Sequence, residues 1–250
     1  MLPLNCHRLQ LALSFYTRLP SVGVLDYTQL PQSAIYLPVV GWLVGGVSAL
    51  AFYLAVQVWT AVTATVIALA VAILLTGGLH EDGFADVCDG FGGGWGKSQI
   101  LAIMKDSHIG VYALLGLLVL MALKLSLLTA LPIAAVPGVM LAAHSISRLQ
   151  PLSLMHCYPY ARTGDSKASV AVYKPSRKEL LYAAGLACLP LWLLPGLCSW
   201  AVIPVVVVNQ CLGTYFYRHI GGYTGDCLGA SQQIAELVFY LSVSALWKFI

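Results

Sequence analysis

The sequence has 250 residues, of which 59% are apolar and 9% are charged, and its mean hydropathy is +0.83. Ordinary soluble domains carry about 25% charged residues, so a soluble fold would lack the polar surface to cover itself. Long unbroken apolar runs, rather than an alternation over about ten residues, argue against a membrane β-barrel and predict an all-α, polytopic membrane protein. The net charge of +3 is too small to indicate a nucleic-acid partner.

In chain order, an N-terminal arm comes first: residues 1–32 include a short amphipathic stretch that ends at Arg18 and Pro20. Seven apolar stretches follow, and a spanning helix needs roughly 20 such residues. They are Ile35–Val58, Ala61–Leu79, Ile109–Leu131, Ile133–Ile146, Leu180–Leu194, Ala201–Phe216 and Ile234–Phe249. We therefore expect residues 1–250 to form a single integral-membrane domain with about seven transmembrane helices and an interfacial arm.

Charge is distributed unequally between alternate connections. The turns near Thr60, Pro132 and residues 195–199 carry no charge. The N-terminal arm and residues 80–108, 147–179 and 217–232 hold nearly every charged residue. The positive-inside rule then predicts that the charged side is cytoplasmic and that any reaction occurs there. The exceptions are Lys124, Glu236 and Lys248; for Lys124, snorkelling outward and pairing with a carboxylate both stay open.

The stretch HEDGFADVCDG, residues 80–90, follows the second apolar run and contains four of the ten acidic residues. On a helix, the i, i+4, i+7 spacing of Asp82, Asp86 and Asp89 puts them on one narrow face. Like charges so placed repel, and Mg²⁺ prefers carboxylate oxygens, so this motif predicts a magnesium site. A solvated helix end would explain any one aspartate alone. Gly83 and Gly90 are expected to loosen or end the helix nearby.

Other polar segments on the same predicted side supply further candidates. The candidate catalytic carboxylates are Asp82, Asp106 in MKDSHIG and Asp226 in RHIGGYTGDCLGA. Thr224 is a candidate substrate ligand. Arginine forks and lysine charges suit phosphate oxygens, although contact with anionic lipid is the simpler explanation for many interfacial cations. The candidate phosphate ligands are Arg148, Arg162 and Lys167.

Five motifs together resemble the cobalamin synthase family, the adenosylcobinamide-GDP ribazoletransferases. They are FYTRLP, HEDGFADVCDG, IMKDSHIG, YARTGD and GGYTGDCLGA, and the likeness runs from about Phe15 to Leu237. The family pattern H-x-D-G-x-A-D-x-x-D-G is matched from His80 to Gly90. Glu81 stands where the family usually has an apolar residue, so it is assigned no role.

The resemblance implies a multi-pass transferase of the bacterial inner membrane, with its active site facing the cytoplasm and a requirement for Mg²⁺. Such an enzyme joins adenosylcobinamide-GDP to α-ribazole or its 5′-phosphate and releases GMP. The implied partners are these substrates and membrane lipid; self-association and contacts with other enzymes of the pathway stay open. On this basis Asp82, Asp86 and Asp89 would hold the metal, while Asp106 or Asp226 would complete its shell or act as the base.

Three other classes of membrane protein fit the motifs and the positions of the acidic residues less well. A CDP-alcohol phosphotransferase would carry D-x-x-D-G-x-x-A-R, but Phe-Gly-Gly-Gly follows Asp89-Gly90. A prenyltransferase would be expected to have a second strong acidic motif, and Asp226 stands alone. A cation carrier would place its carboxylates near the middle of the spans, whereas most acidic residues here lie at span ends.

Overall fold

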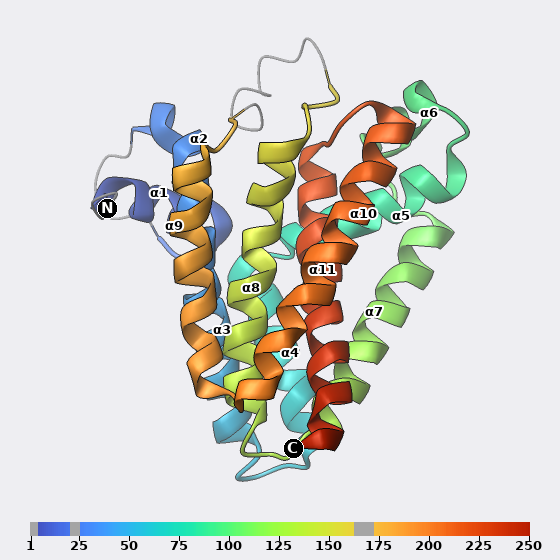
Figure 1. The fold of residues 1–250 in the computed structure, drawn as a ribbon. Coiled ribbons are helices and arrows are strands. Elements are labelled where there is room, and N and C mark those ends of the chain that lie inside the picture. The colour runs from blue at the N-terminus through green and yellow to red at the C-terminus, as the bar shows by residue number, and fades with distance from the viewer. Residues whose placement is uncertain (1–4, 21–25, 163–172) are drawn as a thin grey trace.

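The computed structural model describes residues 5–20, 26–162 and 173–250, which are almost entirely helical (Figure 1). The α-helices are α1 (Cys6–Tyr16), α2 (Leu30–Ser33), α3 (Leu37–Ala55), α4 (Ala61–Thr76), α5 (Leu79–Gly93), α6 (Lys97–Ile103), α7 (Val111–Thr129), α8 (Val136–Cys157), α9 (Arg177–Cys188), α10 (Val202–Ile220) and α11 (Gly225–Leu246). Short 3₁₀ helices are η1 (Tyr27–Gln29), η2 (Ala34–Tyr36), η4 (Leu189–Leu193), η5 (Gly196–Ala201) and η6 (Trp247–Phe249). These residues form no β-strand, only an isolated bridge between Tyr160 and Tyr223.

The predicted all-α membrane architecture is confirmed. Each of the seven apolar stretches forms part of a helix. Within the described residues, three helical segments are long and apolar enough to cross a membrane: Tyr27–Ala55, Val111–Thr129 and Gly196–Ile220. The bent pair α4–α5 would make a fourth. Helices α8 and α11 are as long, but their buried polar residues reduce their hydropathy, so the count of seven spans stays a prediction.

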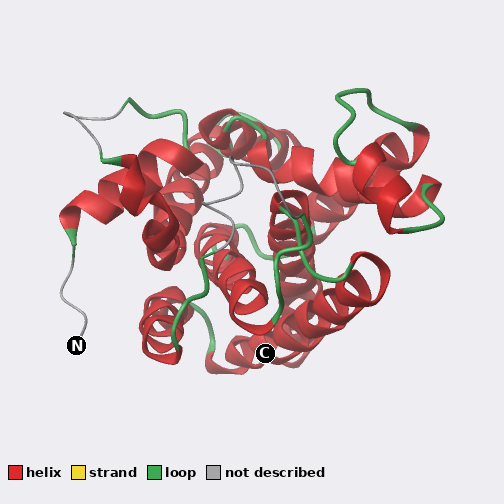
Figure 2. Cartoon of the chain, turned by 90° about the horizontal axis from the view of Figure 1, so that it is seen from above, coloured by secondary structure: helices red, strands yellow, loops and turns green. Residues whose placement is uncertain are grey.

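The two kinds of connection lie at opposite ends of the bundle. In Figure 1 the arm helix α1, the short helix α6 and the start of α11 lie toward the upper end. The uncharged turns after α3 and α7 and the C-terminus lie at the lower end. Viewed from above, the long helices stand side by side around a common centre (Figure 2). The charge sorting predicted from the sequence is thus reproduced by the fold.

The second apolar stretch ends differently from the prediction. Helix α4 stops at Thr76, and Gly77 and Gly78 adopt left-handed φ values of 70° and 73°, which only glycine takes at little cost. The chain turns by 92° there, so α5 runs across the direction of the spans. Helix α5 continues through Gly83 and Gly90 and ends at Gly93, so neither of these glycines ends the helix; whether they loosen it stays a prediction.

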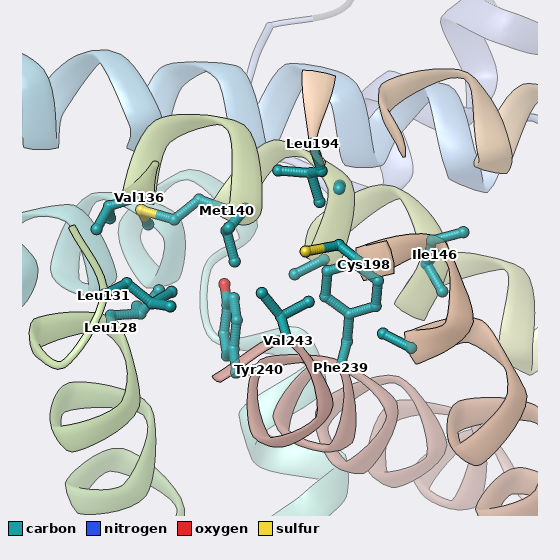
Figure 3. Close-up of a cluster of buried hydrophobic side chains, with 14 of the residues drawn as sticks. Leu128, Leu131, Val136, Met140, Ile146, Leu194, Cys198, Phe239, Tyr240 and Val243 are labelled. Atoms are coloured by element: carbon teal, nitrogen blue, oxygen red, sulfur yellow. The ribbon is translucent and has the colours of Figure 1, made fainter. Parts of the chain in front are cut away.

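Close helix packing holds the bundle together. Gly41 and Gly45 let α3 approach the backbone of α8, since a Cβ at Gly45 would lie 2.9 Å from the Leu141 Cα. At the charge-poor end, apolar side chains from α7, α8, η5 and α11 fill the interior (Figure 3). Phe239, Tyr240 and Val243 project from α11 into this cluster, with the Tyr240 hydroxyl directed toward Met140. This rigid core anchors the far end of the helices whose near ends carry the polar residues.

Candidate active site

Helix α5 crosses α11 at two facing glycines. A Cβ at Gly83 would lie 3.0 Å from the Asp226 carbonyl oxygen, and one at Gly229 would lie 3.2 Å from that of His80. Glycine at both positions permits this close backbone approach. Asp82 and Asp86 flank Gly83, while Asp226 lies in the first turn of α11. The crossing therefore gathers carboxylates from the acidic motif and from the distant glycine-rich loop, as predicted.

Asp82 lies between two cavities. The larger one, about 720 Å³, is bordered by the end of the arm, the α4–α5 break and Asp82 itself. The smaller one, about 160 Å³, is lined by Asp82, Asp226 and His80, and by apolar residues of α1, α3 and α8. Asp82 is exposed, whereas Asp86 is half-buried. The carboxylate of Asp82 thus borders both cavities.

The carboxylates influence one another electrostatically. Partial burial, followed by the charges of Asp226 and Asp82, raises the pKa of Asp86 to about 7. The positive charge of Arg162 opposes this rise; its Nη2 donates to Asp226 Oδ2 at 3.0 Å. Both side chains of that ion pair are 22% exposed. One arginine facing several carboxylates leaves a surplus of negative charge, which a bound cation would neutralise.

Asp82 and Asp86 are chemically suited to Mg²⁺. Neither carboxylate accepts a hydrogen bond from any residue that the structure describes, so their oxygens are free for a cation. Within the same described residues, no group of three or more His, Cys, Asp or Glu side chains is close enough to hold a metal alone. Mg²⁺ is commonly bound by one or two carboxylates plus water and substrate phosphates. The two free aspartates match that requirement.

Asp89 shares the α5 face with the other aspartates, as predicted, but its carboxylate is engaged by another helix. Its Oδ2 accepts from Gly110 N at 2.6 Å and its Oδ1 from Ala113 N at 2.9 Å. It therefore satisfies N–H groups that α7 leaves unpaired at its first turn and places negative charge at the positive end of that helix. A metal role for Asp89 stays a prediction, since each bonded oxygen keeps a second lone pair.

Asp106 is paired with a histidine of its own loop. Its side chain is 57% exposed, it borders neither cavity beside Asp82, and its Oδ1 lies 2.5 Å from His108 Nδ1. This hydrogen bond lowers the pKa of Asp106 and raises that of His108. Asp106 thus lines neither of the cavities that Asp82 borders, and a catalytic role for it stays a prediction.

The predicted substrate ligands have different surroundings. Thr224 is fully buried and caps α11: its Oγ1 accepts from Cys227 N at 3.3 Å and donates to Asp226 Oδ2 at 3.1 Å. Arg148 is 2% exposed, and its Nη1 donates to the His144 carbonyl at 3.1 Å. Lys167 lies outside the described residues. Of the predicted phosphate ligands in the described chain, Arg162 is the one placed beside the carboxylates, and phosphate roles for Arg148 and Lys167 stay predictions.

A buried polar network behind α5 decides between the two alternatives that the sequence left open for Lys124. Lys124, 2% exposed, donates to Glu236 Oε1 at 2.8 Å and to Gln233 Oε1 at 2.7 Å. Gln233 in turn donates to Glu81 Oε1 at 2.9 Å, next to Asp82. Lys124 therefore pairs rather than snorkels. The signal was present, because an isolated Lys and Glu within two apolar stretches must find partners.

These features define a helical membrane protein with a carboxylate-rich site at the charged end of its bundle. The chain belongs to the cobalamin-5-phosphate synthase family, whose model matches residues 8–244. It is 42% identical over 249 residues to the adenosylcobinamide-GDP ribazoletransferase of Shewanella amazonensis, covering 95% of each chain. It is 38% identical over 240 residues to the enzyme of the same name from Ralstonia nicotianae, covering 93% of each. No solved structure matches the chain significantly. The family match confirms the prediction that the chain is a transferase of cobalamin biosynthesis.

Proposed function

We propose that the chain transfers the phospho-cobinamide group of adenosylcobinamide-GDP to α-ribazole or its 5′-phosphate. A ribose hydroxyl of the acceptor forms a new P–O bond at the cobinamide-linked phosphorus. The P–O bond to the guanylyl phosphate breaks, GMP leaves, and the hydroxyl proton passes to a base. The products are adenosylcobalamin, or its 5′-phosphate, and GMP. Both relatives are adenosylcobinamide-GDP ribazoletransferases by name, and the chain matches them over nearly their full length, which supports this choice of substrates.

The observation that carries the proposal is the α5–α11 crossing, which gathers Asp82, Asp86 and Asp226 beside a cavity that Asp82 and Asp226 line. Mg²⁺ held by Asp82 and Asp86 would neutralise charge on the diphosphate and on departing GMP. Asp226 is suited to accept the hydroxyl proton, because Oδ2 is held by Arg162 and Thr224 while Oδ1 has no described donor. Arg162, at the same carboxylate, is suited to a phosphate oxygen.

The membrane setting is also part of the proposal. The charged end of the bundle would face the cytoplasm of a bacterial inner membrane, because positive residues concentrate there. A reporter that is active only outside the cytoplasm, fused after Ile250 at the opposite end, should then be active. Activity of a reporter confined to the cytoplasm at that position would reverse the orientation.

The central test is Asp82→Asn in purified protein. GMP release from adenosylcobinamide-GDP, measured with and without α-ribazole across Mg²⁺ concentrations, should fall at least about a hundred-fold. Asp26→Asn is the matched control, since Asp26 is an exposed aspartate that caps η1 in the arm. It removes one negative charge from a residue that lines neither cavity beside Asp82, and it should leave turnover unchanged. Near-normal turnover of Asp82→Asn at limiting Mg²⁺ would overturn the metal assignment.

A further inference from the structure

The end of the N-terminal arm is hydrogen-bonded to the chain just before the break between α4 and α5. Arg18 N donates to the Leu75 carbonyl at 2.7 Å, just before Gly77. The guanidinium lies against Gly77, where an added Cβ would be 2.9 Å from Arg18 Cζ and 3.0 Å from Nη2. Upstream, Leu11 and Ala12 of α1 are fully buried. The arm is therefore packed onto the bundle, and it holds Arg18 at a defined place.

Arg18 and Asp82 border the same 720 Å³ cavity. The Arg18 side chain is exposed, and its guanidinium neither pairs with nor donates to a residue in the described part of the chain. Glu81, which also borders the cavity, keeps one buried carboxylate oxygen without a described partner. The cavity thus has acidic groups on α5 and an unneutralised cation on the arm. A ligand that carries a cation and phosphates would satisfy both sides.

We propose that Arg18 binds a phosphate of the guanosine-bearing substrate in this cavity. The inference rests on the proposed function, because that function places the metal-bound diphosphate at Asp82. A planar guanidinium makes two parallel hydrogen bonds to phosphate oxygens, and it is always charged. The arm therefore contributes a substrate-binding residue, and the left-handed turn at Gly77 leaves the space in which the guanidinium lies. A membrane-lipid phosphate has the same oxygen chemistry and is the competing source.

The first experiment removes the charge. Arg18→Gln should raise KM for adenosylcobinamide-GDP about ten-fold or more, the size of a lost charge-assisted hydrogen bond, with a smaller effect on KM for α-ribazole. Arg18→Lys keeps the charge but loses the fork, and should recover part of the loss. Arg8→Gln is the matched control: Arg8 lies on the same arm and donates to Gln29 Oε1 at 3.2 Å, away from the cavity.

The second experiment moves the guanidinium without changing any charge. Gly77→Ala introduces a Cβ that collides with Arg18, so the side chain must leave its place. Gly78→Ala is matched for strain, because its φ is 73° against 70° for Gly77, but its added Cβ would meet only Ile73 Cγ2 at 4.0 Å. Similar losses of thermal stability are expected for both variants. A larger rise in KM for Gly77→Ala than for Gly78→Ala is expected if the position of Arg18 matters.

Changing the lipid composition tells whether Arg18 binds a phosphate of the substrate or a phosphate of a membrane lipid. Assays run in nanodiscs of zwitterionic lipid alone and of zwitterionic plus anionic lipid should show the same KM rise for Arg18→Gln. A rise that appears only with anionic lipid, or an unchanged KM in folded Arg18→Gln, overturns the inference. Both results differ from failure of the proposed function, in which the unaltered protein would release no GMP from adenosylcobinamide-GDP.

Discussion

Replacing Gly83 by alanine tests whether the α5–α11 crossing sets the geometry of the carboxylates. The new Cβ would lie 3.0 Å from the Asp226 carbonyl oxygen, 3.1 Å from its Cα and 3.3 Å from the Gly229 Cα. All three are backbone atoms, so no rotamer change relieves the contact. Ordinary contacts begin near 3.4 Å, and the two helices must therefore separate by about 0.4 Å.

That separation predicts a kinetic effect. A displacement of about 1 Å in an active site can cost on the order of 100-fold in rate, so about 0.4 Å should reduce kcat/KM for adenosylcobinamide-GDP by about five- to ten-fold. The change in the free energy of unfolding should be small. Alanine favours the helix by about 1 kcal/mol over glycine, and this offsets part of an overpacking cost of about 1–3 kcal/mol.

Gly93→Ala is the matched control for this experiment. Gly93 lies on the same helix, and its added Cβ would meet only Ile103 Cδ1 at an ordinary 3.6 Å. Both variants also exchange glycine for alanine within α5. GMP release and thermal unfolding of the purified proteins would be measured in parallel. Equal kcat/KM values for Gly83→Ala, Gly93→Ala and the unaltered protein would refute the idea that this crossing positions the site.

Three further predictions concern groups around the site. Lys124→Met leaves the buried Glu236 carboxylate without its lysine partner, so the free energy of unfolding should fall by about 3–5 kcal/mol in thermal unfolding. An unchanged Tm would mean that the ion pair contributes nothing to stability. Asp89→Ala removes the acceptor for N–H groups at the start of α7 and should lower the free energy of unfolding by about 1 kcal/mol. A loss of GMP release at saturating Mg²⁺ that this small destabilisation does not explain would indicate a metal role for Asp89 as well. The Asp106–His108 ion pair exists at pH values above the lowered pKa of Asp106 and below the raised pKa of His108. Asp106→Asn should therefore return the pKa of His108, measured by NMR, toward its ordinary value of about 6.5. An unchanged His108 pKa in this variant would contradict the pairing.

The sequence by itself determined the class of the protein and the face of the acidic helix. Composition and long apolar runs require lipid rather than water around the helices, and this conclusion needs no knowledge of packing. The i, i+4, i+7 spacing puts Asp82, Asp86 and Asp89 on one side of any α-helix, because helical geometry is local. The motifs also identified the family, which residues 8–244 match.

Only the tertiary structure decided which partners those residues meet. Asp89 bonds to α7, Arg162 pairs with Asp226 across 64 positions, and Lys124 finds Glu236 across 112. No local pattern encodes such pairings, because they depend on which helix faces pack and how closely. The 92° turn after α4 and the glycine contact between α5 and α11 set those faces. Burial explains the rest, because in a low-dielectric interior each charge must be paired: Lys124 turned inward to Glu236, whereas the carboxylates of Asp82 and Asp86 accept no hydrogen bond from the described residues.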